Sequence, residues 1–131
     1  MTIYSIFEFI VRAISSIFEK GGRQMPRARF QTLTEQMFYI LLCLREECCG
    51  IDILDRVSAM TGGRVNVGSG TLYDLLERFC QAGMIRETRV EGRRRSYLLT
   101  DKGRETLDKE YRRIQAQAED YRRHMGEERY P

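Results

Sequence analysis

The sequence predicts a mainly α-helical fold with one small β-hairpin, completed by a long C-terminal helix. Three segments between residues 33 and 83 carry apolar residues at helical spacing. Two β-like segments then flank Glu91-Gly92, a pair that suits a tight hairpin turn. A regular apolar seam occupies residues 107–125, which is typical of a helix that packs against a partner helix.

The length of 131 residues suits one compact domain with one additional arm. The net charge of +3 is only mildly basic, so any affinity for nucleic acid must come from local clusters of arginine. The charged and hydrophobic fractions, 31% and 42%, are those of a globular protein and favour neither disorder nor a membrane protein. No secretion signal is recognisable, so we expect a cytoplasmic protein with reduced thiols.

Residues 1–24 form an N-terminal segment whose composition differs from that of the rest of the chain. An amphipathic helical extension is one interpretation, because the apolar residues follow a 4-3-4-3 spacing. The other is a translated leader upstream of a true start at Met25, because the codons of residues 20–23 can resemble a ribosome-binding site. The residues on the spacing are Ile3, Phe7, Ile10, Ile14 and Ile17.

Thr34 is the expected N-cap of the first helix, over residues 34–45, which is dense in apolar residues and therefore mostly buried. Gly50 marks a turn, and a second helix stops at Gly62-Gly63. Residues 64–67 are expected to form a short β-like connection. The residues on the buried face of the second helix are Ile53, Leu54, Val57 and Met60.

The third helix is expected between Gly68 and Gly83, and its start is small and rich in hydroxyl groups. Free amides, hydroxyls and the positive end of the helix dipole all lie at such a start. The start can therefore approach a phosphate backbone closely. Ser69, Gly70 and Thr71 form it, and Leu72, Leu75, Leu76 and Phe79 form the apolar face of the helix.

Residues 84–90 and 93–99 are the expected strands of the hairpin. Arg93, Arg94 and Arg95 lie at its turn, where they can contact phosphates or a minor groove, although three arginines can also be a merely solvated strand face. The order helix, helix, helix, hairpin predicts a winged helix-turn-helix domain over residues 30–100, with the hairpin as the wing.

Thr100 is the expected cap of a long terminal helix over residues 101–125, and residues 126–131 form a tail. The apolar seam of this helix has a 4-3-4-3-4 spacing, which favours dimerisation through paired helices. The alternative is that the helix folds back on its own domain, because the seam is short and the first helix also needs cover. The seam residues are Leu107, Tyr111, Ile114, Ala118, Tyr121 and Met125.

The cysteines and the histidine form neither a metal framework nor a catalytic group. Four cysteines and one histidine lack the spacing of a zinc site, and we expect no metal and no cofactor. Cys43 and Cys80 are expected in the core, and Cys48 and Cys49 are either turn residues or a redox or soft-metal sensor. No nucleophile lies near a histidine, and no phosphate-binding loop is present, so the sequence does not indicate an enzyme.

Several short motifs together are similar to the PadR family of bacterial transcriptional regulators, in particular to its compact subgroup with a single C-terminal helix. The resemblance covers about residues 30–125, and its most specific part combines the runs 68–73 and 99–103. The resemblance implies a homodimeric, ligand-responsive repressor that binds a near-palindromic operator in double-stranded DNA. The motifs are residues 33–35, 38–41, 61–65, 68–73 and 95–103.

The resemblance also implies roles for individual residues. The run 49–51 departs from the family, because Cys-Gly-Ile stands where many relatives have His-Gly-Tyr. Asp74 and Glu77 follow the first turn of the third helix and would repel phosphate, so we expect base reading at the helix start. The implied DNA-facing residues at that start are Ser69, Gly70, Thr71 and Tyr73, those near the phosphates are Tyr39 and Arg64, and those of the wing are Arg93, Arg94 and Arg95.

Some members of the family hold a small hydrophobic or aromatic effector between their paired terminal helices. The chain has no tryptophan to stack on such a ligand, and Tyr111, Tyr121 and Phe38 either line a pocket of this kind or are packing residues. The sequence does not identify the effector. A winged helix can also serve as a protein-interaction adaptor without sequence-specific DNA binding, and this is the alternative function.

Overall fold

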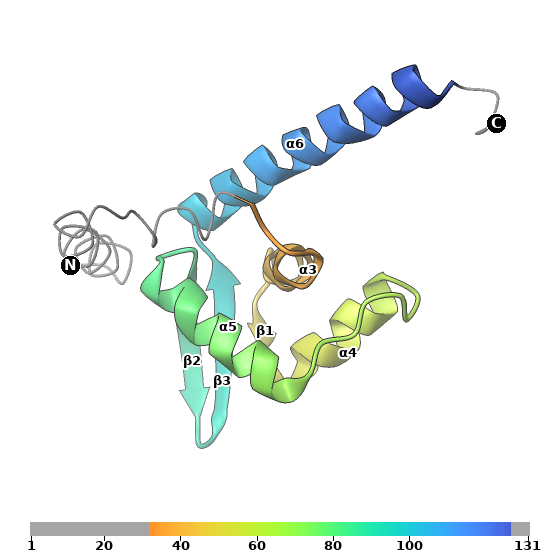
Figure 1. Cartoon of the computed structure of the whole chain (residues 1–131). Helices are drawn as coiled ribbons and strands as arrows, with labels where there is room; N and C mark the ends of the chain where they lie inside the picture. The colour runs from red at the N-terminus through yellow and green to blue at the C-terminus, as the bar shows by residue number, and fades with distance from the viewer. Residues whose placement is uncertain (1–31, 127–131) are drawn as a thin grey trace, which may run out of the picture.

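The computed structural model describes residues 32–126 (Figure 1). The predicted N-terminal segment 1–24 lies outside the described residues, as do residues 127–131 of the predicted tail. The elements are α3 (Glu35–Cys43), β1 (Cys48–Cys49), α4 (Gly50–Met60), α5 (Ser69–Gln81), β2 (Ile85–Glu91), β3 (Arg94–Leu99) and α6 (Asp101–Met125). This order confirms the predicted mainly helical fold with a wing and a long C-terminal helix.

The helix α3 lies at the centre of the domain, with α4 and α5 on one side and α6 crossing on the other (Figure 1). Thr34 caps α3 as predicted, because its side chain accepts a hydrogen bond from the backbone N–H of Met37. The hydrophobic core gathers apolar residues from all of these helices. Burying each such side chain stabilises the fold by about 1.5–3 kcal/mol.

The apolar faces predicted for α4 and α5 are largely right. Leu72, Leu75, Leu76 and Phe79 of α5 are all buried, as are Ile53 and Val57 of α4, and Leu54 packs against this core. Met60 is the exception, since it is 39% exposed. Met60 is the last residue of α4, so its side chain lies beyond the part of the helix that α3 and α5 cover.

The strands form one antiparallel sheet with the order β1-β3-β2. Glu91 pairs with Arg94, so the turn consists of Gly92 and Arg93, and the predicted turn pair Glu91-Gly92 is wrong by one residue. Gly92 has a φ of +63°, a conformation that glycine adopts without a steric penalty. The register between β2 and β3 therefore determines which residues form the turn of the hairpin.

The vicinal cysteines are not turn residues, contrary to one interpretation of the sequence. Cys48 pairs with Tyr97 and Cys49 with Ser96, so they form the short edge strand β1. Conversely, residues 64–67, expected to be β-like, form no strand. A strand as short as β1 has no periodicity of its own and exists only because β3 offers it hydrogen bonds.

Cys43 lies in the core as predicted, whereas Cys80 is only partly buried against it. Burial raises the pKa of the Cys48 thiol to about 12 and that of Cys80 to about 11, and it also raises the pKa of Cys43. A protonated thiol is a poor nucleophile and a poor metal ligand, which favours a packing role for Cys48 over a sensing role. Within residues 32–126 no group of three or more metal-ligating side chains gathers.

The start of α6 is anchored tightly to the base of the hairpin. Thr100 caps the helix, because its Oγ1 accepts from the Gly103 backbone N–H (3.1 Å) and donates to the Gly83 carbonyl oxygen (2.6 Å). Gly103 is buried, and a Cβ at this position would collide with the carbonyl oxygen of Met84. The first turn of α6 therefore requires glycine at this contact.

The buried part of α6 ends at Glu110. Leu107 belongs to the core, and Glu110 is only 3% exposed. Hydrogen bonds from Arg113, together with one from the backbone N–H of Leu33, hold the pKa of Glu110 below its ordinary value. Residues 111–125 are all exposed, and this half of α6 extends away from the domain (Figure 1). No helix among residues 32–126 has the length and apolar character needed to cross a bilayer.

Candidate nucleic-acid interface

The start of α5 and the tip of the hairpin lie on the side of the domain that faces away from α6 (Figure 1). Ser69, Gly70 and Thr71 are exposed there, and Tyr73 is 51% exposed. Gly68 occupies the N-cap position, and no side chain of residues 32–126 caps this helix start. The first amides of α5 are therefore free to bind an anion such as a phosphate.

The surface at Gly70 is open, whereas Gly50 is closely covered. A Cβ built on Gly70 meets nothing within 4 Å among the described residues, so another molecule can approach the backbone there. A Cβ on Gly50 would lie 3.5 Å from the rings of both Tyr73 and Tyr97. The start of α4 is thus packed against the ring of Tyr73, which orients this side chain at the edge of the interface.

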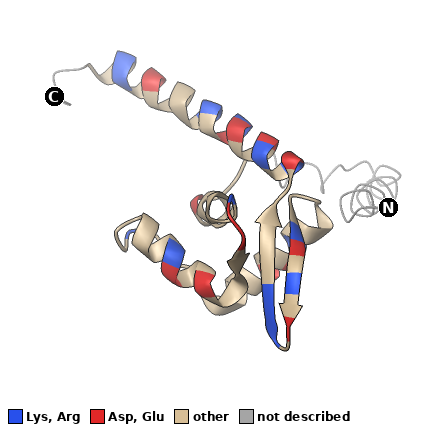
Figure 2. Ribbon diagram, turned by 180° about the vertical axis from the view of Figure 1, so that it is seen from behind, with Lys and Arg blue, Asp and Glu red and all other residues tan. Residues whose placement is uncertain are grey.

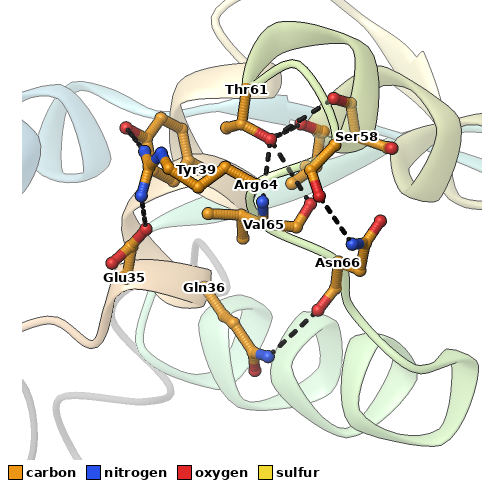
Figure 3. Close-up of polar contacts among 10 residues, drawn as sticks. Glu35, Gln36, Tyr39, Ser58, Thr61, Arg64, Val65 and Asn66 are labelled. Atoms are coloured by element: carbon orange, nitrogen blue, oxygen red, sulfur yellow. Dashed lines mark hydrogen bonds and ion pairs between the residues drawn. The ribbon is translucent and has the colours of Figure 1, made fainter.

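Tyr39 and Arg64, predicted near the phosphates, contact each other (Figure 3). The Nη2 of Arg64 donates to the hydroxyl of Tyr39 (2.9 Å), and the guanidinium lies 5.7 Å from the centre of the tyrosine ring. Arg64 also forms an ion pair with Glu35. Glu35 was not predicted for the site. It lies one helical turn before Tyr39, but its partner is far away in the sequence, so no spacing rule connects them.

The turn between α4 and α5 holds Arg64 in place (Figure 3). The Oγ1 of Thr61 donates to the carbonyl oxygen of Val57 (2.9 Å) and accepts from the backbone N–H of Val65 (3.0 Å). Gly62 and Gly63 adopt φ values of +61° and +80°, which disfavour residues with a Cβ. The run 61–65 therefore has a structural purpose, namely to present Arg64 beside α3.

Arginine and glutamate alternate along β2, whereas the arginines of the turn and of β3 are consecutive (Figure 2). Arg94 pairs with Asp52 (3.8 Å), and Arg95 pairs with Glu87 (3.1 Å). Arg93 lies in the turn and has no ion pair among residues 32–126. A further arginine of β2 belongs to the same network: Arg89 lies near Glu47 (3.9 Å) and Glu91 (3.4 Å). The sequence prediction found the arginines but not their carboxylate partners.

A groove of about 440 Å³ separates α5 from the sheet. Glu77 and Glu87 face it, and both contribute, after burial, to the raised pKa of Cys80. Glu87 is paired with Arg95 (3.1 Å), but two carboxylates in one groove still make it less favourable for a phosphate than the uncapped helix start. The lining residues are Tyr73, Leu76, Glu77, Cys80, Glu87, Arg95 and Tyr97.

The predicted dimerisation seam of α6 divides into two parts. Leu107 is buried in the core of its own domain, as the fold-back alternative expects for the first part of the helix. The remaining seam residues form an exposed apolar stripe, in which Ile114 is 41% exposed. Phe38 lies apart from this stripe, on α3, against the core and the ring of Tyr39. The exposed seam residues are Tyr111, Ile114, Ala118, Tyr121 and Met125.

Residues 40–109 match the sequence model of the transcriptional regulator PadR-like family. The fold is similar to that of a transcriptional regulator from Clostridium thermocellum, with a TM-score of 0.59 and 20% identity over 66% of this chain and 89% of that one. It is also similar to the complex structures of hsRosR-S1 and hsRosR-S4, with TM-scores of 0.51 and 0.52 and 23% identity to each. These matches cover 69% and 72% of this chain and 77% and 94% of theirs. No curated protein is significantly similar in sequence.

Proposed function

The chain belongs to the PadR-like family of transcriptional regulators, and from this premise we propose that it binds a near-palindromic operator as a homodimer and represses transcription in the cytoplasm. Membership of this family implies DNA binding and a function other than catalysis. Repression would follow from occlusion of a promoter by the bound protein.

The observation that carries the proposal is the position of the uncapped start of α5 and the tip of the arginine-bearing hairpin on one side of the domain (Figure 1). The uncapped start of α5 can enter a major groove, where Ser69, Thr71 and Tyr73 would reach base edges. Arg64, held by Tyr39, would contact a phosphate beside that groove. The arginines of the wing would contact phosphates or the adjacent minor groove. The acidic groove behind α5 limits how deeply the helix can enter.

The proposed dimer forms through the exposed stripe of α6. The five seam residues beyond Leu107 are exposed in the described structure, and paired helices would bury them by knobs-into-holes packing. The two α5 helices of such a dimer would then bind half-sites separated by one helical repeat of DNA, about 34 Å. A palindromic operator follows from this twofold symmetry.

An effector, if it follows the mode of the family, would be small and hydrophobic or aromatic and would bind between the paired α6 helices. Tyr111 and Tyr121 of the exposed stripe are the aromatic side chains available there. A ligand that binds one arrangement of the helices better than the other would shift the half-site spacing away from the operator and release the DNA.

The test is a DNA-binding selection with one substitution at the helix start. The full chain is used to select duplexes from a randomised library, and the affinity of the selected duplex is compared between variants. Thr71→Glu places a negative charge in the first turn of α5, which favours the helix but repels phosphate, so we expect a folded protein with at least tenfold weaker binding, an estimate from the strength of charged hydrogen bonds.

Gln115→Glu, which adds the same charge to the exposed half of α6, is the control and should bind like the wild type. Failure of the library to yield any enriched duplex would contradict the proposal and would favour the adaptor alternative. Equal binding by Thr71→Glu and Gln115→Glu would show that the α5 start does not contact DNA.

A further inference from the structure

We propose that Asp52 and Glu47 are specificity residues, whose carboxylates restrain the arginines of the wing and thereby weaken binding to random DNA more than binding to the operator. This inference rests on the proposed function, since it assumes that the wing contacts DNA. Neither residue belongs to the wing. Each pairs with an arginine on it: Asp52 with Arg94 (3.8 Å) and Glu47 with Arg89 (3.9 Å).

The edge strand β1 brings these carboxylates to the wing. Cys48 and Cys49 pair with Tyr97 and Ser96 of β3, and Glu47 and Asp52 lie on either side of this short strand in the sequence. Asp52 is in the first turn of α4, so its ion pair connects the helix-turn-helix to the tip of the hairpin. The carboxylates are therefore built into the frame that positions the wing.

Fold stability does not explain these pairs. The side chains of Arg94 and Asp52 are 63% and 52% exposed, and those of Arg89 and Glu47 are 61% and 44% exposed. Ion pairs at such exposed positions contribute little to the free energy of unfolding. They do change what an approaching phosphate meets, because the guanidinium already has an anion beside it and the carboxylate itself repels the phosphate.

The restraint affects random and specific DNA differently. Binding to random DNA depends almost wholly on phosphate contacts made in many orientations, and an arginine held by a carboxylate suits few of these orientations. In the operator complex the base contacts of α5 fix a single orientation. A guanidinium has donors on more than one edge, so Arg94 can keep Asp52 on one edge and offer the other to a phosphate. Asp52 thus already orders the Arg94 side chain in the free protein, which lowers the entropy cost of ordering it when the operator binds.

The experiment compares matched carboxylate substitutions in the full chain. Asp52→Asn is compared with Asp55→Asn, which removes the same charge from an exposed residue of the same helix that has no ion pair among residues 32–126. Glu47→Gln is compared with Glu46→Gln in the same way. The probes are the duplex selected by the wild-type chain and a duplex of identical composition with a shuffled sequence.

We expect Asp52→Asn to bind the shuffled duplex about two- to fivefold more tightly than the wild type, from the usual strength of exposed ion pairs, with little change on the selected duplex. Asp55→Asn should leave the ratio of the two affinities unchanged. In an Arg94→Gln background, Asp52→Asn should tighten binding to the shuffled duplex no more than Asp55→Asn does, because the coupling between Asp52 and Arg94 is gone and only the loss of one negative charge remains.

The inference is overturned if Asp52→Asn and Asp55→Asn tighten random binding equally, since net charge alone would then explain the change. It is also overturned if the effect of Asp52→Asn on the shuffled duplex is undiminished in the Arg94→Gln background. Both results presuppose that the wild-type chain binds DNA, so they reject the inference while leaving the proposed function intact. A wild-type chain that binds neither duplex would reject both.

Discussion

Arg64 donates a hydrogen bond from Nη2 to the hydroxyl of Tyr39 across 2.9 Å, and so connects the loop before α5 to the first helix of the domain. The same guanidinium pairs with Glu35 and lies over the ring of Tyr39. An arginine held by two partners presents its remaining donors in a defined direction. This direction suits the proposed contact of Arg64 with a phosphate beside α5.

Tyr39→Phe is expected to weaken binding to all DNA by about two- to tenfold, because removing a hydrogen bond of typical strength releases Arg64 from its orientation. The melting temperature should change little, since the ring and its packing remain. Fluorescence anisotropy with the selected and the shuffled duplex measures the effect. Arg64→Lys, which keeps the charge but loses the planar fork, should weaken binding as well. Normal binding by both variants would remove this cluster from the interface.

Gly103→Ala is expected to lower the free energy of unfolding by about 1–3 kcal/mol or more, the usual range for an overpacked core site. The added Cβ would collide with the carbonyl oxygen of Met84 and press on Leu99, so either α6 or the hairpin must shift. Denaturant unfolding at fixed protein concentration measures the change. An unfolding midpoint equal to that of the wild type would show that the start of α6 is less tightly packed than described.

Gly70→Ala tests the start of α5 with a substitution that should weaken DNA binding without lowering the stability of the fold. A Cβ at Gly70 meets no described atom within 4 Å, and alanine is the better helix former by up to about 1 kcal/mol. The fold should therefore be as stable or slightly more stable, while binding to DNA weakens because the backbone can no longer approach the groove as closely. Electrophoretic mobility shifts and thermal melts on the same preparation separate the two effects. Unimpaired binding would place the DNA elsewhere on α5.

Arg93→Ala is expected to reduce the slope of log affinity against log salt concentration by about 1, the value for one lost phosphate contact. Arg93 has no ion pair among the described residues, so no carboxylate offsets the positive charge that it offers to a phosphate. Replacing Arg94 and Arg95 together should reduce the slope by less than about 2, because Asp52 and Glu87 already neutralise them in part. Titrations at several salt concentrations give both values. A fall of the slope by about 2 or more for the double replacement, or an unchanged slope for Arg93→Ala, would contradict this prediction.

The exposed stripe of α6 predicts the oligomeric state. Asp at both Ile114 and Ala118 should convert a dimer into a monomer without lowering the helical content, since neither residue is buried within its own chain. Static light scattering measures the mass. Ala116→Asp, on the opposite face of the same helix, is the control and should remain dimeric. A variant that keeps the wild-type mass would exclude the stripe as the dimer interface.

The ion pair of Glu110 is expected to make part of the free energy of unfolding sensitive to acid. Its pKa lies below the ordinary value of 4.5 in the folded chain, chiefly because Arg113 donates to the carboxylate. The unfolded chain therefore takes up the proton first as the pH falls, so the stabilisation is present above about pH 4.5 and is lost as the pH falls through the folded-state pKa. Urea unfolding from neutral to acidic pH should show a smaller loss for Glu110→Gln than for the wild type. Parallel curves would refute the assignment.

Sequence reasoning succeeded where a residue's role depends on its neighbours along the chain. The caps Thr34 and Thr100 and the buried face of α5 follow from local hydrogen bonding and helical spacing. It failed where a distant segment decides the outcome. Cys48 and Cys49 became a strand because β3 lies beside them, and the hairpin turned one residue later than predicted because of its pairing register.

The candidate site shows the same division. The arginines of the wing and the small residues at the α5 start are visible as clusters in the sequence. Their partners are not: Asp52 reaches Arg94, and Glu35 reaches Arg64, only after the helices have packed. Patterns of spacing do not encode such long-range pairs, because each partner taken alone is an ordinary exposed carboxylate.

We propose that this chain reads a DNA sequence through α5 and holds the DNA backbone through its arginines. The most direct measurement is the affinity of the full chain for the selected and the shuffled duplex over a series of salt concentrations. We expect a preference for the selected duplex of about a thousandfold or more and a linear fall of log affinity with log salt concentration for both duplexes. Equal affinity for the two duplexes, or an affinity that does not change with salt, would contradict the proposal.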